Sequence, residues 1–251
     1  SMGQKTISDI ISDFIKEAKG NRKAKDSRKG VMRLFNDYLA GYGELESNVE
    51  QAPLIVLAKI SKLEAWHFRH FLSWFIIQKV ICDNKAEYAP MLMEFVEWLW
   101  AKAVISEKVH REMTRVFEEL KGEPERCEKL SRLLYEFAQR DLPKFEEWRR
   151  DPKAYARKAA VLKAIHHKQP TEILDGYFTV TRVGPTALWL VPVDEDYEDS
   201  PRPKKGAAEI GPVQVPAEAA KLARVGDGMS LAIGKMNDYW KMLETGNVYP
   251  L

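Results

Sequence analysis

SKLEAWHFRHFLSWFIIQKVICDNKAEYAPMLMEFVEWLWAKAVI, residues 61–105, is the most apolar and most aromatic stretch of the 251-residue chain. In each half, apolar residues recur three and four positions apart, which predicts two amphipathic helices joined by a polar turn at 83–85. The two stripes are Phe68, Phe71, Leu72, Phe75 and Ile76, then Tyr88, Leu92, Phe95, Val96 and Leu99. Further faces of the second helix carry Met91, Met93, Trp98 and Trp100. We therefore expect this helix to be buried on most sides, with the rest of the N-terminal half packed around it.

The sequence on both sides of this stretch predicts further helices by the same spacing rule. They span residues 7–19, 26–39, 54–60, 107–120, 123–141 and 144–168. Ser106 is a suitable N-cap, and Pro124 is suited to the first turn of the helix that it opens. The last of these helices is polar and mostly positive.

Beyond Pro170 the pattern changes from helical to alternating. The predicted strands span residues 177–183, 187–193, 207–215, 229–233 and 239–243. Gly184-Pro185 supplies a turn, Pro216 begins a short helix, and residues 194–206 form an acidic, proline-bearing loop. Short strands at this spacing indicate a small antiparallel barrel. The fold class is therefore α+β: an all-α helical bundle followed by a small β-barrel.

The net charge of +2 is unevenly distributed along the chain. Residues 1–169 hold 31 Lys and Arg against 25 Asp and Glu, a balance of +6, and residues 170–251 hold 8 against 12, a balance of −4. This asymmetry suggests different partners for the two parts, with any polyanion facing the first. Cys82 and Cys127 are too few for a disulfide framework or a metal set. With no secretory leader and no apolar run that could span a bilayer, we expect a reduced, cytoplasmic protein without a membrane partner.

No catalytic motif is recognisable. GxSxG, HExxH, P-loop and GxGxxG patterns are absent, and Gly226-Asp227-Gly228 fits a hairpin turn better than a phosphate-binding loop. His67 and His70 have a spacing that metal ligands can use, but no third ligand is apparent and their aromatic neighbours favour a packed face. We therefore expect no catalytic residues, no metal and no cofactor, although sequence does not reveal a site assembled from distant residues.

Two clusters of basic residues are the strongest functional signal. Phosphate binding needs grouped Lys and Arg on a rigid surface, and counterion release raises the affinity. For a single cluster the alternative is a solvated helix face, but two clusters in one half of a chain favour nucleic-acid binding. The residues expected to contact DNA are Arg22, Lys23, Lys25, Arg28, Lys29, Arg149, Arg150, Arg157, Lys158, Lys163 and Lys168.

Four segments between residues 7 and 105 resemble, in order, the helices of the SAM-like core-binding domain of phage integrases and other tyrosine recombinases. They are ISDIISDFIKEAKG, SRKGVMRLFNDYLAG, LEAWHFRHFLSWFI and EYAPMLMEFVEWLWAKAVI. The resemblance implies a four-helix bundle that clamps duplex DNA through backbone contacts, with Lys25, Arg28, Lys29 and also Lys85 facing the DNA. The spaced arginines, HxxR box and nucleophilic tyrosine of the recombinase catalytic domain have no counterpart here.

We therefore predict three parts: a SAM-like bundle at 1–105, a helical extension with a basic helix at 106–169, and a small SH3-like barrel at 170–251. The leading hypothesis is a non-catalytic DNA-binding protein that contacts the duplex backbone. The alternative is a protein–protein interaction scaffold whose barrel, with its acidic loop, recruits a partner or dimerises.

Overall fold

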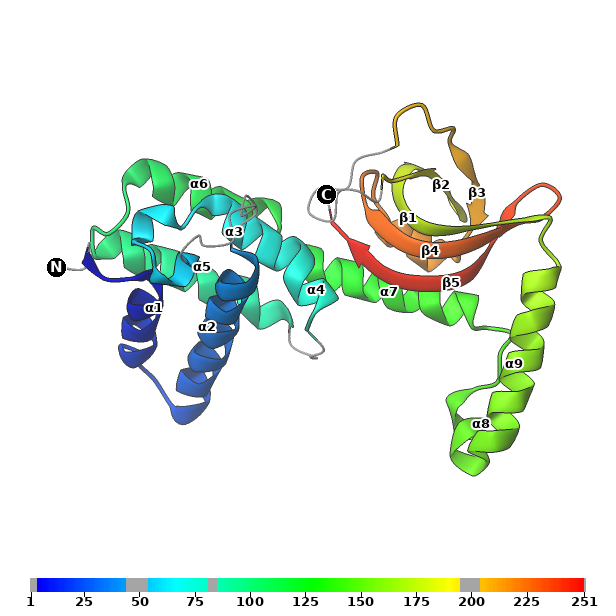
Figure 1. Cartoon of the computed structure of the whole chain (residues 1–251), viewed down its shortest axis with the longest axis horizontal. Helices are drawn as coiled ribbons and strands as arrows, with labels where there is room; N and C mark the ends of the chain where they lie inside the picture. The colour runs from blue at the N-terminus through cyan, green and yellow to red at the C-terminus, as the bar shows by residue number, and fades with distance from the viewer. Residues whose placement is uncertain (1–3, 44–53, 81–84, 195–203, 251) are drawn as a thin grey trace. The chain divides into compact units, whose positions relative to one another are not determined.

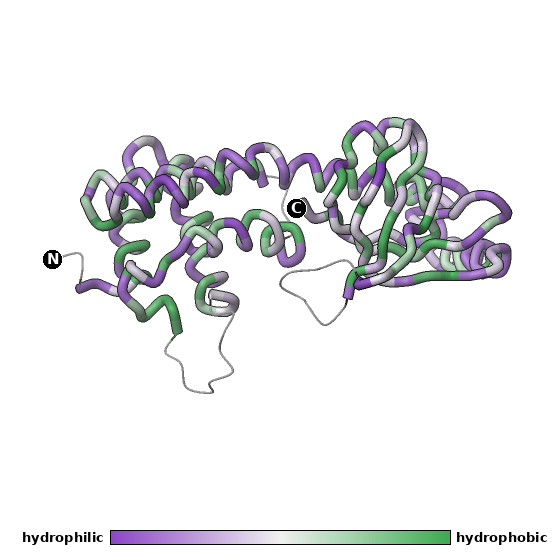
Figure 2. Tube along the Cα trace, turned by 90° about the horizontal axis from the view of Figure 1, so that it is seen from above, coloured by the Kyte–Doolittle hydropathy of each residue, from purple (hydrophilic) through white to green (hydrophobic). Residues whose placement is uncertain are grey.

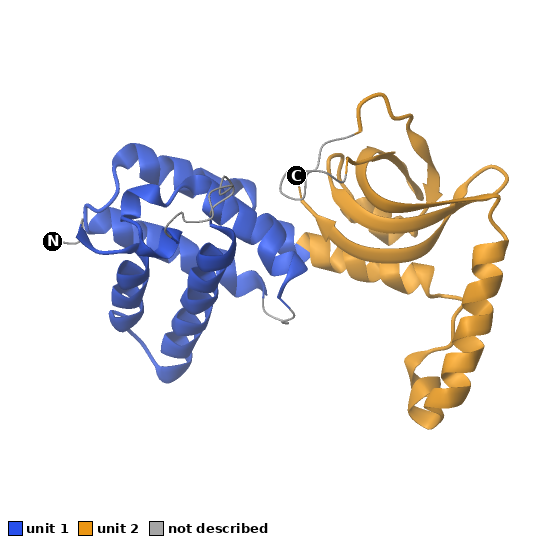
Figure 3. Cartoon of the chain, viewed as in Figure 1, with its two compact units in different colours: residues 1–125 blue, residues 126–251 orange. Residues whose placement is uncertain are grey.

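The computed structural model describes residues 4–43, 54–80, 85–194 and 204–250 (Figure 1). Helices come first and a closed five-stranded β-barrel follows, as expected. The chain divides into two compact units, residues 1–125 and residues 126–251 (Figure 3). The change from helix to strand falls near residue 170, but the helices after residue 125 belong to the unit that contains the barrel. Residues 44–53, Cys82, the first two residues of the predicted polar turn at 83–85 and most of the expected acidic loop at 194–206 lie outside the described residues.

Unit 1 is helical. Its elements are α1 (Ile7–Lys16), α2 (Arg22–Tyr42), α3 (Ala65–His70), a π-helical turn (Phe71–Phe75), α4 (Ile76–Gln78), α5 (Tyr88–Ala101) and α6 (Glu107–Glu119). Short 3-10 turns lie at Ile55–Leu57, Ile60–Lys62 and Lys85–Glu87. The third, fourth and fifth of these α/π elements run on without a break, so the first half of the aromatic stretch is one helical rod.

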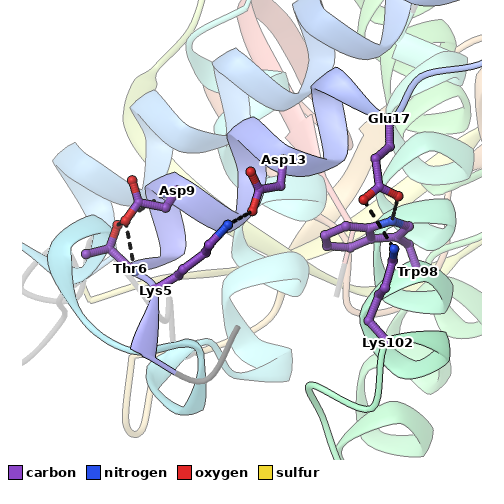
Figure 4. Close-up of polar contacts among 7 residues, drawn as sticks. All are labelled: Lys5, Thr6, Asp9, Asp13, Glu17, Trp98 and Lys102. Carbon is purple, nitrogen blue, oxygen red and sulfur yellow. Dashed lines mark hydrogen bonds and ion pairs between the residues drawn. The ribbon is translucent and has the colours of Figure 1, made fainter. Parts of the chain in front are cut away.

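Side-chain caps fix where the first helices begin. Thr6 and Asp9 form a capping box at the start of α1: the Asp9 N–H donates to Thr6 Oγ1 (3.1 Å) and the Thr6 N–H donates to Asp9 Oδ2 (3.2 Å) (Figure 4). Asn21 caps α2, accepting from the N–H of Ala24 at 2.9 Å. The helix predicted from residue 26 therefore begins four residues earlier, and the basic segment forms the first two turns of a longer helix.

The predicted apolar stripes make the core of unit 1. Phe35 of α2 lies 5.1 Å from Phe68 and 5.2 Å from Phe71, ring centre to ring centre, and all three are fully buried. Along the helices, apolar and polar stretches alternate as expected for one-sided burial (Figure 2).

The expectation that α5 is buried on most sides is wrong. Met93 is 42 % exposed and Trp100 is 46 % exposed. Trp98 is half-buried, and its indole Nε1–H donates to Glu17 (2.9 Å) beside the ammonium of Lys102 (Figure 4). An indole has a polar edge as well as an apolar ring, so a tryptophan-rich helix can keep part of its circumference in water.

Unit 2 contains the barrel, with one short helix between its third and fourth strands. The elements are β1 (Glu172–Val183), β2 (Ala187–Pro192), β3 (Ile210–Gln214), α10 (Ala217–Leu222), β4 (Gly228–Lys235) and β5 (Trp240–Tyr249). The strand order is β1-β2-β3-β5-β4, closed by β1 against β4. Neighbouring strands are antiparallel except β3 and β5, which run parallel at Val213 and Trp240. This Greek-key order, in which β3 skips β4, is that of an OB-type barrel rather than of an SH3-like one.

Helix α7 (Glu123–Ala138) packs on this barrel through its residues beyond 125 (Figure 1). Cys127, Leu130 and Leu134 are fully buried, and Ser131 Oγ accepts a hydrogen bond from the N–H of Val248 on β5 at 2.9 Å. The helix start predicted at Glu123-Pro124 is confirmed. The sequence did not predict that this helix packs on the barrel.

A buried ion pair fixes α7 to the turn before β4. The Arg126 guanidinium donates to both carboxylate oxygens of Asp227, each at 2.7 Å, and also to the carbonyl oxygen of Leu222 at 2.9 Å. The Arg126 side chain is 9 % exposed and that of Asp227 is 1 % exposed. The backbone N–H of Arg224 completes the Asp227 site at 2.8 Å. The GDG turn is therefore held by an arginine from a distant helix.

Candidate nucleic-acid interface

The first basic cluster lies on the exposed start of α2. Arg22, Lys23, Lys25 and Lys29 are exposed, and Arg22 makes one weak ion pair with Asp26 at 3.7 Å. No acidic residue lies in the first turn of this helix. Positive side chains at a helix N-terminus oppose the helix dipole, by about 0.3–1 kcal/mol each in exposed positions. The cluster therefore does not stabilise its own helix, but it does concentrate positive potential there.

Arg28 differs from its neighbours because it faces the bundle. Its side chain is 17 % exposed, and its guanidinium lies 4.1 Å above the Phe14 ring. Nη1 donates to the Phe14 carbonyl oxygen and Nη2 to a carboxylate oxygen of Glu94, both at 3.2 Å. Arg28 thus joins α2 to α1 and α5, and these contacts use the donors that were expected to face DNA.

Lys85 lies in the same region of unit 1 as the start of α2. The hydroxyl of Ser27 donates to Glu87 at 3.2 Å, which places the turn Lys85–Glu87 beside the basic cluster. Lys85 is half-buried. The carboxylates of Asp26, Glu87 and Glu94 therefore interrupt the positive surface of unit 1.

The second cluster lies on a helical hairpin of unit 2, α8 (Phe145–Arg150) and α9 (Pro152–Lys168), which we call the arm (Figure 1). Neither helix has a buried residue. Residues 144–168 hold eight Lys and Arg against three Asp and Glu, a balance of +5. An isolated helix of this length is marginal in water, so the arm needs local stabilisation.

Local stabilisation comes from the turn and from composition. The Asp151 carboxylate accepts the N–H groups of Lys153 (3.1 Å) and Ala154 (3.0 Å), with Pro152 at the first helical position. Five alanines favour the helical state of α9. At the root of the arm, Glu244 of β5 pairs with Lys163 at 2.5 Å and with His167 at 3.8 Å. The Lys163 contact, more than the His167 charge, lowers the pKa of Glu244.

The basic side chains of the arm fall into two groups. Lys158 pairs with Glu147 of α8 at 3.1 Å, and Lys163 pairs with Glu244, so these two hold the hairpin and its root. Arg157 and Lys168 are exposed and, at 100° per residue, share one face of α9 with Lys153. Arg149 and Arg150 end α8 and are exposed too. The exposed group, Arg149, Arg150, Arg157 and Lys168, offers positive charge on an otherwise unburied surface.

Sequence reasoning missed two aromatic side chains on the arm. Phe145 is 57 % exposed and Trp148 is 43 % exposed, although both are large and apolar. Their rings stack, with centroids 5.1 Å apart and planes 16° from parallel, and the Arg149 guanidinium lies 5.3 Å from the Phe145 centroid. The three-residue spacing of Phe145 and Trp148 indicates that the two rings share one face of a helix, but the surrounding segment is polar and no aromatic site was predicted there.

The outer face of the barrel also carries an aromatic–cation pair, on Trp189. Leu188 and Leu190 point inward, so Trp189 between them points outward. The Arg182 guanidinium lies 3.8 Å from the indole centroid and donates to Glu209 at 3.0 Å. A Cβ placed on Gly211 would come within 2.4 Å of the indole, so the ring rests directly on that backbone. This indole already has close neighbours.

The histidine pair of α3 belongs to the packed interior. His67 is 1 % exposed; its Nδ1 accepts the N–H of Glu64 and its Nε2 lies against the carbonyl oxygen of Gly43, both at 2.9 Å. Burial lowers the pKa of His67, against the smaller opposing effects of the Gly43 and Glu64 backbone contacts. His70 Nδ1 lies 2.9 Å from the Tyr38 hydroxyl. Across the described part of the chain, no three His, Cys, Asp or Glu side chains are grouped so as to hold a metal ion.

Within the same described ranges, no helix combines the length and the apolar character needed to cross a bilayer.

Comparison with known proteins identifies no relative: no protein-family model, no curated protein and no solved structure matches this chain.

Proposed function

We propose that this protein binds DNA without catalysing a reaction on it, and that the arm and the start of α2 contact the phosphate backbone. The observation that carries the proposal is the arm: a hairpin that buries none of its residues yet holds a balance of +5. On α9 one face is only half-buried, at Tyr155, Ala159, Leu162 and His166, so the hairpin gains little from folding against its own protein and an external partner accounts for it better. Its charge makes a polyanion the best-matched partner.

The start of α2 supports the same proposal independently. Arg22, Lys23 and Lys25 lie at the helix end that already carries a positive partial charge, which is unfavourable unless an anion approaches, and Lys29 lies one turn further along. The resemblance of residues 7–105 to the core-binding domain of integrases also implies contact with duplex backbone. OB-type barrels hold oligonucleotides in other proteins, but a fold alone does not assign a function, and residues 170–251 carry a balance of −4.

The test is duplex binding as a function of salt. Anisotropy of a labelled duplex gives Kd over a series of salt concentrations, and each lost phosphate contact lowers the slope of log K against log salt by about 0.9. We compare two fourfold variants, R22Q/K23Q/K25Q/K29Q and R149Q/R150Q/R157Q/K168Q. Each is expected to weaken binding and to flatten the slope. Arg28 stays unchanged because its loss would damage the bundle itself.

A matched control removes four exposed cations from other surfaces, two in each unit. K108Q/R111Q/K205Q/K221Q has the same net charge as each test variant. The proposal predicts that this control stays close to the wild type. If duplex binding is undetectable at low salt, or if the control loses as much affinity as the test variants, the proposal is wrong.

The barrel favours a second candidate function, docking of a protein partner. Ile173 is 41 % exposed and Tyr177 is 45 % exposed, and their spacing of four residues places both on one face of β1. If this face is a docking surface, I173T/Y177T reduces self-association in sedimentation or partner recovery in crosslinking. A wild-type chain that remains monomeric and recovers no partner would exclude this candidate.

A further inference from the structure

The arm combines two kinds of surface that backbone binding alone does not require. Phosphates need only cations, yet α8 also exposes a stacked Phe145–Trp148 pair directly before Arg149 and Arg150. Exposed aromatics of this size are unfavourable in water, and neither ring has been withdrawn into the barrel core. The pair therefore calls for an explanation other than the fold.

Rigid placement makes these rings usable. Glu147, between the two aromatics, accepts Lys158 of α9 through its carboxylate (3.1 Å) and the N–H of Asp151 through its carbonyl oxygen (3.1 Å). The Asp151 cap then starts α9 immediately, so α8 is joined to α9 by a single capping residue. The C-terminal end of α8 is thus fixed to α9 by local bonds, and no flexible linker separates the two helices.

Resting on the proposed function, we infer that the Phe145–Trp148 pair stacks on unpaired bases, so that the arm prefers DNA with an open or single-stranded segment over a fully paired duplex. Every base has an aromatic face, and stacking on a protein ring is independent of base identity. The neighbouring Arg149 and Arg150 would hold the phosphates next to the stacked base. In a paired duplex the bases are stacked on one another, and these rings would have no such contact.

The experiment uses three labelled DNAs of equal length and charge: a full duplex, a duplex with a central mismatched bubble, and the same bubble built from abasic sites. The wild type is compared with F145L/W148L, which keeps apolar side chains at both exposed positions but removes the rings. The matched control is V161T/I165T, which alters two exposed apolar residues elsewhere on the arm. Circular dichroism of each variant reports whether the arm remains helical.

The wild type should bind the bubble more tightly than the duplex, by about 5- to 150-fold if one base stacks. F145L/W148L should lose this preference while its duplex affinity and salt slope stay unchanged; V161T/I165T should keep it. The abasic bubble should bind like the duplex. A preference that survives in F145L/W148L, or that the abasic bubble retains, overturns the inference but leaves the proposed function standing. Absence of binding to all three DNAs instead overturns the proposed function.

Discussion

Breaking the Arg126–Asp227 pair should destabilise unit 2 far more than its single pair of charges suggests. In Arg126→Met the Asp227 carboxylate, 1 % exposed, loses both guanidinium bonds of 2.7 Å and retains the Arg224 N–H bond. Removing one member of a buried pair costs about 3–5 kcal/mol, since the remaining charge stays out of water without compensation. Stabilities of domains are only about 5–15 kcal/mol, so this is a large part of the total.

Hydrogen exchange measured by mass spectrometry is the suitable assay because it reads the barrel separately from unit 1. Peptides from β4 and β5 report the opening of the unit that Arg126 holds. A loss of 3–5 kcal/mol corresponds to exchange that is roughly 150- to 5,000-fold faster, at 1.36 kcal/mol per factor of ten. The matched control is Lys158→Met, which removes an exposed pair whose side chains are 57 % and 45 % exposed. Exposed pairs contribute about 0–1 kcal/mol, so the control should change exchange by about fivefold or less.

A double variant separates the two contributions. R126M/D227L removes both charges and should be less destabilised than R126M alone, because no unpaired carboxylate remains. The pair is not a buried, mutually dependent unit if R126M exchanges within about fivefold of the wild type. The same holds if the stability lost by R126M/D227L equals the sum of the losses in R126M and in D227L.

Three further predictions concern single side chains. Burial lowers the pKa of His67 in the folded state, so the unfolded state binds more protons below about pH 6.5. The stability that depends on neutral His67 should therefore be fully present above that pH and fall as the pH drops. Urea unfolding at pH 7.5 and 5.5 should show a smaller pH effect in His67→Gln than in the wild type. An equal pH effect in both proteins would exclude His67 as the cause. Asp151→Ala should lose about 0.5–2 kcal/mol of helix stability in the arm, measured by exchange of α9 peptides, whereas Asp151→Asn keeps the cap and should change little; equal exchange in the two variants would contradict the capping role. Arg28→Ala should lower the free energy of unfolding of unit 1, measured by urea titration, by roughly 1–3 kcal/mol, while Lys29→Ala, which removes an exposed neighbour, should leave it within about 0.5 kcal/mol. A similar loss in both would mean that Arg28 does not hold the bundle together.

Local signals in the sequence were reliable where the physics is local. Ser106 caps α6 through the N–H of Val109, and the turn at Gly184-Pro185 separates β1 from β2 as expected. Apart from the half-buried Tyr88, the apolar stripes of the central stretch are buried, because three- and four-residue spacing fixes which side chains share a face. Residue spacing does not predict which other element a buried helix face packs against. The stripe on α7 fits a helical bundle as well as a barrel, so its place beside β5 was not predictable.

The candidate site was predictable in composition but not in orientation. Both basic clusters were visible as runs of Lys and Arg, and most of their side chains are exposed. Arg28 faces inward because Phe14 and Glu94 meet it there, and both lie far from it in sequence. Phe145 is likewise exposed because no other element of the described structure packs over its ring. Such facts belong to tertiary structure, and hydropathy assigns large rings to the interior by default.

The contact between the Trp189 indole and the Gly211 backbone limits which sequences this barrel tolerates. Gly211 is required by the bulk of a neighbouring ring, since a methyl group there would meet the indole at 2.4 Å. Alanine at 211 would therefore be accepted only together with a smaller side chain at 189. In a randomised library the two positions should vary as a pair, so that a residue on one strand records the size of its neighbour on the next.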